Sequence, residues 1–240
     1  MYEALGFTKN PFFTEPLEPS KESLEKFVGR REDVHSYLAQ IAGQEGCVHL
    51  VTGNPGVGKT TFVNVMQYVT SFDDPKTCFK DITHCPTLLI PNTKKLQINS
   101  DETAQSLMLK ITSSIIYSLV HIYEKKEQRL PQEVEKQHKW INELIVSVGK
   151  PTGGAQAFGF GASGGGGSIS QAVPTSASIS HLAQIDRQIL ESALPDLGMN
   201  GIYVIVNNLD IVDLNVLVQI LNELRDELFS IKSLWITLLD

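Results

Sequence analysis

The sequence predicts an α/β fold in which a mostly parallel sheet is covered by helices on both faces. Apolar runs rich in β-branched residues alternate along the chain with stretches that repeat apolar residues at helical spacing. A glycine-rich turn joins the first of these runs to a helix, and the chain of 240 residues is 42% hydrophobic, enough for one large core. The expected strands are 47–51, 86–92, 202–206 and 233–240.

The N-terminal part is predicted to hold an extended strap, a helix and the first strand. Residues 1–26 are rich in proline, phenylalanine and charge, so we expect a strap that packs on the fold and not a domain. The segment 29–43 repeats apolar residues at helical spacing and ends in a glycine that can terminate a helix. Its expected buried residues are Val34, Tyr37, Leu38 and Ile41.

The region 94–181 is predicted to be a helical insertion that follows the second strand. Asn99 and Glu102 are spaced as in a capping box, which indicates a helix start at that point. A more polar helix over 132–148 is expected to pair with this helix as a hairpin. The apolar face expected for the first helix consists of Leu107, Ile111, Ile115, Leu119 and Ile122.

The stretch 151–178 inside this insertion has a different composition from its surroundings. It consists largely of glycine, alanine and serine, which bury too little apolar area to offset the entropy of ordering. We therefore predict a flexible loop. A plain linker, a functional loop that orders against a partner or ligand, and an artificial linker all stay open at this point.

Residues 182–240 are expected to complete an α/β core that also contains residues 27–93. A helix over about 181–194 precedes the strand 202–206, and an amphipathic helix over 214–229 precedes the last strand. The residues expected to face inward on the amphipathic helix are Leu217, Leu221, Leu224 and Leu228.

The motif that indicates chemistry is "GNPGVGKTT", residues 53–61, which matches the phosphate-binding P-loop pattern G-x-x-x-x-G-K-[ST]. Its glycines allow backbone N–H groups to point at phosphate oxygens, and the following helix adds its positive end. Lys59 is expected to contact the β- and γ-phosphates of ATP, and the Thr60 hydroxyl to ligate Mg²⁺. The predicted phosphate-binding residues are Gly53, Asn54, Pro55, Gly56, Val57, Gly58, Lys59, Thr60 and Thr61.

Two asparagines follow the strand 202–206. P-loop enzymes that hydrolyse nucleotides place an aspartate at this strand end to hold the water shell of Mg²⁺, often followed by a carboxylate that activates the attacking water. Here those positions are Asn207 and Asn208. Asp210 lies nearby and could take over a catalytic role, although an aspartate in a strand-to-helix turn is more often a helix cap.

The combination of motifs resembles AAA+ P-loop ATPases, in particular the branch of origin-recognition and helicase-loader proteins and the signalling STAND ATPases. The resemblance covers residues 1–93 and about 182–240. "FVGRREDV" resembles the box that lines the adenine pocket in that branch, which implies adenine contacts for Val28, Gly29 and Arg30. "VIVNNLD" resembles the acidic strand motif, with Asn207 at the magnesium position and Asn208 at the catalytic-base position.

The resemblance also implies a sheet order of 5-1-4-3-2, of which the four predicted strands are the first four. The fifth strand, the sensor residues, the arginine finger and the helical lid of the family would follow Asp240. We therefore expect a fragment of a longer protein or a protein completed by a partner. The edge of the strand 47–51 is expected to lack a neighbour.

Asparagine in place of the two acids predicts binding of Mg-ATP with slow or absent hydrolysis. Its amide can still hydrogen-bond a magnesium-bound water, but it has no charge and accepts no proton. Loss of a positioned base costs about 10²- to 10⁴-fold in rate. Natural degeneration and deliberate substitution of Asn207 and Asn208 both fit the sequence.

Three functions follow from these observations. The first is an ATP-binding switch or assembly module of AAA+ or STAND type, with self-association or further C-terminal domains as partners. The second is an AAA+ helper acting on DNA in replication or transposition, but the net charge of -7 gives no support for DNA contact. The third is a scaffold with a vestigial pocket.

A cytoplasmic location is predicted from the cysteines and the lack of targeting segments. Cys47, Cys78 and Cys85 form no C-x-x-C pair and are expected to be reduced. Residues 1–13 show no signal-peptide pattern, and the most apolar helical stretch, 111–123, falls short of a membrane span. We expect no membrane partner.

Overall fold

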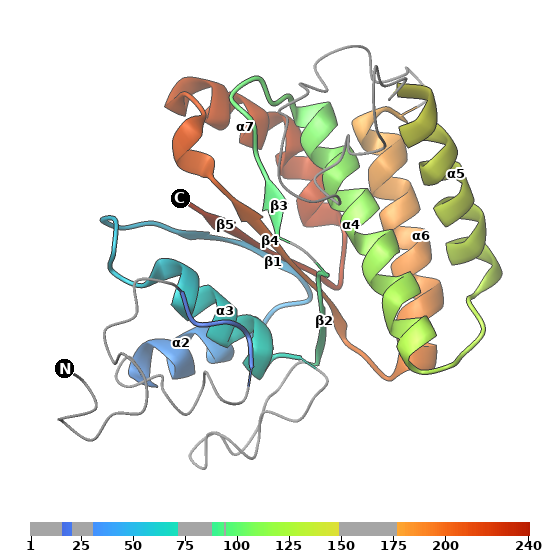
Figure 1. The fold of residues 1–240 in the computed structure, drawn as a ribbon, viewed down its shortest axis with the longest axis horizontal. Coiled ribbons are helices and arrows are strands. Elements are labelled where there is room, and N and C mark those ends of the chain that lie inside the picture. Colours follow the sequence, from blue (N-terminus) through green and yellow to red (C-terminus); the bar gives the residue numbers. More distant parts are fainter. Residues whose placement is uncertain (1–15, 21–30, 72–87, 94, 149–176) are drawn as a thin grey trace, which may run out of the picture.

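The computed structural model describes residues 16–20, 31–71, 88–93, 95–148 and 177–240, with only the backbone for Arg31 and residues 145–148. The adenine-box residues Val28, Gly29 and Arg30, nearly all of the glycine-rich stretch and most of the strap lie outside these residues. The described part is an α/β fold with a parallel sheet and helices on both faces, as predicted (Figure 1).

The sheet has the strand order β1-β5-β4-β2, and the short β3 also pairs with β4. All described pairs are parallel. This order agrees with the one expected for the four predicted strands, and β1 ends the sheet among the described strands. The strands are β1 (Cys47–Val51), β2 (Leu89–Pro91), β3 (Leu96–Gln97), β4 (Gly201–Asn207) and β5 (Leu234–Leu239).

Strand β3 was not predicted from the sequence. Its two residues pair with the C-terminal end of β4, Leu96 with Val206 and Gln97 with Asn207. β2 pairs with the beginning of β4 on the same side, so β2 and β3 together cover one edge of that strand. Two residues are too few to display the period-two alternation by which a strand is recognised.

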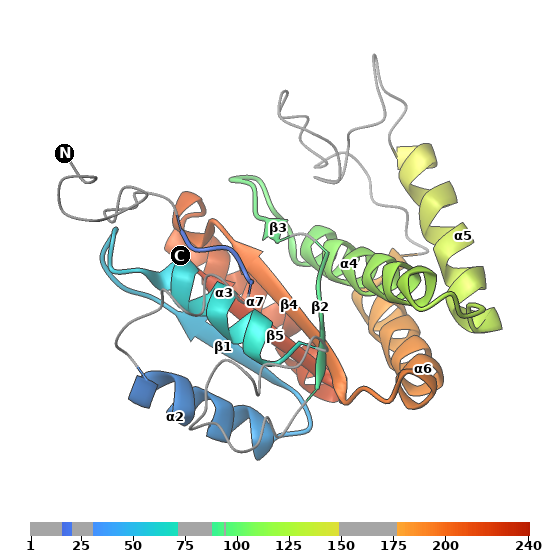
Figure 2. The ribbon, with the colours of Figure 1, turned by 60° about the horizontal axis from the view of Figure 1, so that its bottom comes forward.

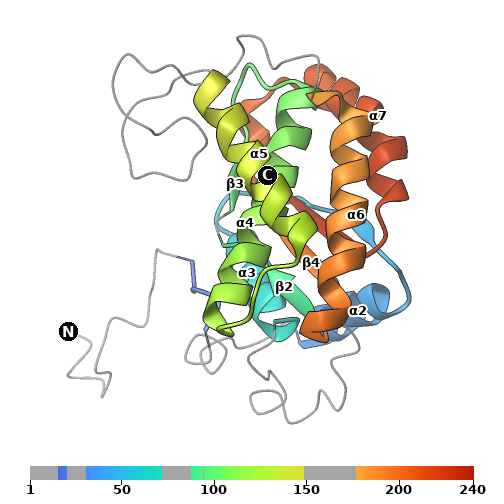
Figure 3. The ribbon, with the colours of Figure 1, turned by 90° about the vertical axis from the view of Figure 1, so that its right-hand side faces the viewer.

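Helices form two layers around the sheet (Figures 1 and 2). Helices α2 (Arg31–Ala42) and α3 (Lys59–Val69) cover one face. Helices α4 (Ala104–Lys125), α6 (Ile179–Leu197) and α7 (Leu214–Ser230) cover the other face. Helix α5 (Gln132–Val148) packs on α4 and α6, so the predicted helical hairpin is extended by α6 into a group of three (Figure 3).

Strand β4 separates two hydrophobic cores because its side chains alternate between the faces of the sheet. Ile202, Val204 and Val206 pack on the α4 side, whereas Tyr203 and Ile205 pack on the α2 and α3 side. All five are 0% exposed, which is typical of a strand buried on both faces of a parallel sheet.

Helix α4, which lies in the predicted insertion 94–181, shares a hydrophobic core with one face of the sheet. Of its 22 residues, 17 are buried, because the helix lies between the sheet, α5, α6 and α7. It has the length and composition of a membrane span, but 89% of that stretch is buried inside the fold, as in a core helix. All five residues predicted for its apolar face are buried.

Two local predictions for the helices were confirmed only in part. The capping box of α4 is formed by Thr103 and Ser106, whose side chains exchange hydrogen bonds with each other's backbone N–H groups. Glu102 accepts a hydrogen bond from the Asn99 N–H group and also pairs with Lys110. On α7, Leu224 and Leu228 are buried as predicted, together with Ile220. The predicted Leu217 and Leu221 also pack against the core but are only partly buried, at the border of that row.

Candidate phosphate-binding site

The predicted phosphate loop lies between β1 and α3 and is exposed to solvent from Thr52 to Gly58. Gly56 and Gly58 have φ angles of 82° and 85°, in the region that favours glycine. A side-chain carbon at either position would meet no neighbouring atom within 4 Å, so the space beside the loop is open. The backbone thus adopts the curl that the glycine spacing predicts.

The N-terminus of α3 can accept an anion. Gly58 is its N-cap, and no side chain caps the first turn. The first helical hydrogen bond runs from the Phe62 N–H group to the Gly58 carbonyl, at 2.9 Å. The first turn contains no acidic residue, so the positive end of the helix dipole faces the loop without a neutralising carboxylate from its own turn.

Lys59 folds back across the loop. Its ammonium group donates a hydrogen bond to the Gly53 carbonyl, at 2.5 Å, and lies 3.0 Å from a carboxylate oxygen of Asp240. An oxyanion therefore already occupies one contact of the lysine that the motif assigns to phosphate. Side-chain exposures of 14% for Lys59 and 32% for Asp240 indicate that this ion pair is partly withdrawn from water.

Asp240 belongs to this site, although it was not predicted from the sequence. Strand β5 lies between β1 and β4, and its register pairs Leu239 with Val51. The carboxyl ends of parallel strands meet at one edge of the sheet, so Asp240 follows β5 directly beside the loop. Its N–H group approaches the Val51 carbonyl at 3.4 Å. The sequence signal that could have found Asp240 is an aspartate directly after the strand that neighbours β1.

Asn207 lies at the end of β4, at the same edge of the sheet but two strands from β1. Two strand spacings correspond to roughly 10 Å. Asn207 and Asn208 are half-buried, and Asn208 has a left-handed backbone with φ 68° and ψ 40°. No hydrogen bond or ion pair connects either side chain to the loop in the described part of the chain.

Asp210 is exposed in the 3-10 helix η4 (Leu209–Ile211) and is not a helix cap. The cap of α7 is Asp213, whose carboxylate accepts hydrogen bonds from the N–H groups of Asn215 and Val216 at 2.9 and 3.4 Å. Asp213 therefore has a structural role, and Asp210 remains available to solvent at the edge of the site.

The protein oxygens at this site could hold Mg²⁺ only together with further ligands from a phosphate group. In the described residues, no three His, Cys, Asp or Glu side chains lie together as a metal site. Thr60 and Asn207 each offer a neutral side-chain oxygen, which Mg²⁺ accepts as a ligand directly or through water. The charge for such a site would come from phosphate oxygens and from Asp240.

The described part of the strap contacts the first turns of α3. The Leu17 N–H group donates to the Thr61 hydroxyl at 3.3 Å, and the Asn64 amide donates to the Leu17 carbonyl at 2.5 Å. The Thr61 hydroxyl therefore holds the strap, which leaves its backbone N–H group as the part of Thr61 that can face a phosphate.

A cluster of buried polar side chains lies between α2 and the sheet, next to β1. The hydroxyls of Tyr37, Tyr203 and Thr237 hydrogen-bond one another at 2.7 to 2.8 Å. Burial raises the pKa of the Cys47 thiol to about 12 and lowers the pKa of His49, which hydrogen-bonds that thiol. Cys47 is free, as predicted, and its raised pKa makes it a poor nucleophile. Cys78 and Cys85 lie outside the described residues.

No protein-family model, curated protein or solved structure matches the chain. The chemistry of the site is therefore argued from the loop motif and from the side chains around it.

Proposed function

We propose that this chain binds ATP with Mg²⁺ at residues 53–61 and acts as a switch or assembly module of AAA+ or STAND type. The observation that carries the proposal is the contact of Lys59 with a carboxylate at the mouth of an open glycine loop. The ammonium group, the uncapped N–H groups of α3 and the helix dipole all favour an anion at one place.

The sheet supports the finer assignment to a P-loop ATPase of AAA+ order. One strand, β5, separates β1 from β4, as the resemblance implies for the loop strand and the strand bearing the acidic motif. The same resemblance gives the adenine contacts to Val28, Gly29 and Arg30. A cytoplasmic location and self-association belong to the same proposal. β1 is the last strand of the sheet among the described strands, and its own residue Leu50 is 59% exposed, which supports a partner at this strand.

Each residue has a separate task in this proposal. Backbone N–H groups of the loop hold the phosphates, and Lys59 contributes the charge. The Thr60 hydroxyl and, through water, the Asn207 amide would hold Mg²⁺, which neutralises phosphate charge when it is bound. Asn208 accepts no proton from water, so hydrolysis is slow or absent. Bound nucleotide would then set the packing of domains or subunits.

Calorimetric titration with ATP and Mg²⁺ tests the proposal on the parent protein and on Lys59→Ala. The variant should bind about 10- to 100-fold more weakly, because hydrogen bonds to a charged group contribute about 1.5–3 kcal/mol. Lys139→Ala is the matched control, since Lys139 is an exposed lysine on α5. Negligible binding to both proteins would leave only the scaffold hypothesis, and equal, measurable binding to both would contradict the proposed role of Lys59.

A further inference from the structure

The edge formed by strand β1 is the least covered part of the described sheet. β1 ends the sheet among the described strands. Its residues Val48, His49 and Val51 are half-buried, and Leu50 is exposed. Strands β4 and β5, which lie inside the sheet, are buried along almost their whole length. The described helices therefore leave one side of β1 open to solvent.

The open side of β1 presents backbone hydrogen-bonding groups. The Asp240 N–H group approaches the Val51 carbonyl, so the backbone of Val51 faces β5. Successive residues of a strand turn their backbone groups to opposite sides in the plane of the sheet. The N–H and C=O groups of Val48 and Leu50 therefore point away from β5, where no described strand pairs with them.

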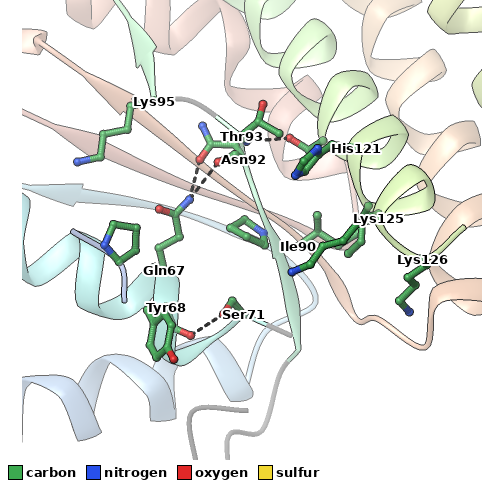
Figure 4. Close-up of a pocket in the computed structure, with 14 residues that line it drawn as sticks. Gln67, Tyr68, Ser71, Ile90, Asn92, Thr93, Lys95, His121, Lys125 and Lys126 are labelled. Atoms are coloured by element: carbon green, nitrogen blue, oxygen red, sulfur yellow. Dashed lines mark hydrogen bonds between the residues drawn. The ribbon is translucent and has the colours of Figure 1, made fainter. Parts of the chain in front are cut away.

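The two edges of the sheet differ in their protection against pairing. Natural edge strands are often protected by proline, lysine or a covering element. At the opposite edge, β2 contains Pro91, and Lys95, Lys125 and Lys126 line the cavity of about 690 Å³ between β2, α3 and α4 (Figure 4). β1 has the sequence Cys-Val-His-Leu-Val, without a charged residue or proline. The β1 edge is therefore able to accept another strand.

An exposed row of side chains on α7 follows the helix at the spacing of one face. Most of its members are apolar, and they are Leu214, Val218, Leu221, Arg225 and Phe229. Arg225 is the only charged member, and its long apolar stem lets the charge reach water. Leu221 is partly buried, so the row borders the core.

The α7 row and the β1 edge belong to one surface. On the opposite flank of α7, Glu227 lies 3.8 Å from Arg187 of α6, so the row faces away from α6. Helix α7 contacts β1. Val48 packs against the core on the α7 side of the sheet, and Leu50, two residues later, points to the same side.

The area of this surface is sufficient for a stable dimer. Leu214, Phe229, Leu50 and Val218 are 71%, 64%, 59% and 49% exposed. With about 200 Å² for a fully exposed large side chain, they present on the order of 500 Å² to solvent. A patch of this size on a monomer is often functional. Two copies would bury about 1,000 Å² from these side chains alone, and the rest of β1 and α7 brings the total into the range of about 1,200–2,000 Å².

We propose that a second copy of this chain pairs here, with the two β1 strands antiparallel and the two α7 helices side by side. A two-fold axis at His49 places Val48 opposite Leu50 of the second copy, so that their outward N–H and C=O groups hydrogen-bond one another. An identical edge thus satisfies every free group of this edge. The dimer specifies the self-association within the proposed function and rests on that part of it, not on nucleotide binding.

The same axis brings the α7 rows together. The two α7 helices are then antiparallel, and Leu214 approaches Phe229 of the second copy. Helices pack about 8–10 Å apart, which is roughly two strand spacings, so the helix contact and the strand pairing can form together.

Sedimentation equilibrium of the nucleotide-free chain tests the proposal. We expect a dimer with twice the 26.5 kDa mass of the chain. Val218→Lys should raise the dissociation constant about tenfold or more, because it places a cation in the apolar row of both copies. Val216→Lys is the matched control, since Val216 is 39% exposed on the other flank of α7, and it should leave the dimer unchanged. A monomer throughout the concentration series, or equal effects of the two variants, would overturn the proposal.

His49→Cys tests the strand pairing itself. Residues that face each other across the axis without hydrogen bonds have Cα atoms about 4.5 Å apart, within the range of a disulfide. Oxidation with diamide should link this variant, but not the parent protein, into a covalent dimer through residue 49. A dimer without that link would overturn the β1 pairing.

Calorimetric titration of the same proteins with ATP separates this inference from the nucleotide hypothesis. ATP binding by a protein that stays monomeric would overturn the dimer alone. A dimer that binds no ATP would support the β1 pairing while contradicting the proposed nucleotide site.

Discussion

The ammonium group of Lys59 lies 3.0 Å from the carboxylate of Asp240, which joins the phosphate loop to the end of the neighbouring strand β5. This pair places a negative charge where the motif expects phosphate. Nucleotide binding would therefore begin with the exchange of one oxyanion for another at Lys59. The contact makes the affinity for nucleotide sensitive to a residue outside the loop.

Substituting Asp240→Asn should strengthen ATP binding in the absence of Mg²⁺ by about two- to fivefold. The ion pair is partly exposed, and such pairs contribute about 0.2–1 kcal/mol to the state that contains them. Removing the carboxylate removes that contribution from the nucleotide-free protein only. Calorimetry on parent and variant measures the difference, with Asp226→Asn as control, since Asp226 is exposed on α7. Weaker binding by Asp240→Asn would instead assign Asp240 a supporting role toward the nucleotide.

Restoring acids at the end of β4 should produce ATP hydrolysis. The double substitution Asn207→Asp with Asn208→Glu supplies a charged ligand for the magnesium water shell and a proton acceptor. A positioned base is expected to raise the rate by about 10²- to 10⁴-fold. Phosphate release from saturating Mg-ATP is the measurement, and the same pair of substitutions combined with Lys59→Ala is the control. No gain over the parent protein would contradict our interpretation of the amides.

The fold was predictable where local patterns extend over many residues. The buried face of α2, the apolar row of α4 and the glycine turn before Lys59 all follow from spacing along the chain. Side chains brought together by strand pairing were not predicted. Asp240 approaches Lys59 only because β5 lies beside β1, and β3 exists only because two residues meet the end of β4.

Competition between neighbouring caps explains the error at the start of α4. Asn99 and Glu102 have the right spacing, and Glu102 does accept a hydrogen bond from the Asn99 N–H group at 3.1 Å. Its carboxylate also pairs with the buried Lys110. The helix itself begins at Ala104, with Thr103 as its N-cap. The buried ion pair depends on tertiary contacts and has no signature in local spacing.

The hydroxyl triangle of Tyr37, Tyr203 and Thr237 should be strongly coupled. Removing one member leaves buried hydroxyls with an unmatched partner, which costs about 1–3 kcal/mol. We expect Tyr37→Phe and Tyr203→Phe each to lower the free energy of unfolding by that amount. The double variant should lose less than the sum, because the second substitution removes a group already left unpaired. Urea denaturation of the four proteins tests the coupling, and full additivity would contradict it.

The same cluster predicts alkaline destabilisation. Burial raises the pKa of Tyr37 to about 12 and the pKa of Tyr203 well above its ordinary value. An unfolded tyrosine ionises near pH 10, so from that pH upward the unfolded state holds fewer protons than the folded state. Stability should therefore fall as pH rises from about 10 to 12. The decline in melting temperature over this window should be shallower in Tyr37→Phe, and an unchanged decline would contradict the assignment.

The buried carboxyl group of Asp186, between α4 and α6, should make the stability of the protein depend on pH. It lies on the face of the sheet opposite the hydroxyl cluster. Its side chain is 0% exposed, one oxygen accepts a hydrogen bond from the Thr112 hydroxyl at 3.0 Å, and the other has no partner among the described residues. Burial raises the pKa of this carboxyl well above its ordinary value. The folded state then keeps a proton that the unfolded state loses above about pH 4, so Asp186 lowers stability as pH rises from there.

Replacing Asp186 with asparagine should therefore stabilise the protein at pH 7. The amide has nearly the same shape, needs no proton to stay neutral and can still accept from Thr112. We expect a gain of about 1–3 kcal/mol at pH 7 that shrinks as the pH falls to about 4, because below that pH the parent side chain is neutral in both states. Urea unfolding at pH 4.5 and 7 measures both values, with the exposed Asp226→Asn as the matched control. A loss of stability at pH 7 with Asp186→Asn would mean that the carboxylate is charged in the folded protein, with a cation close enough to hold it.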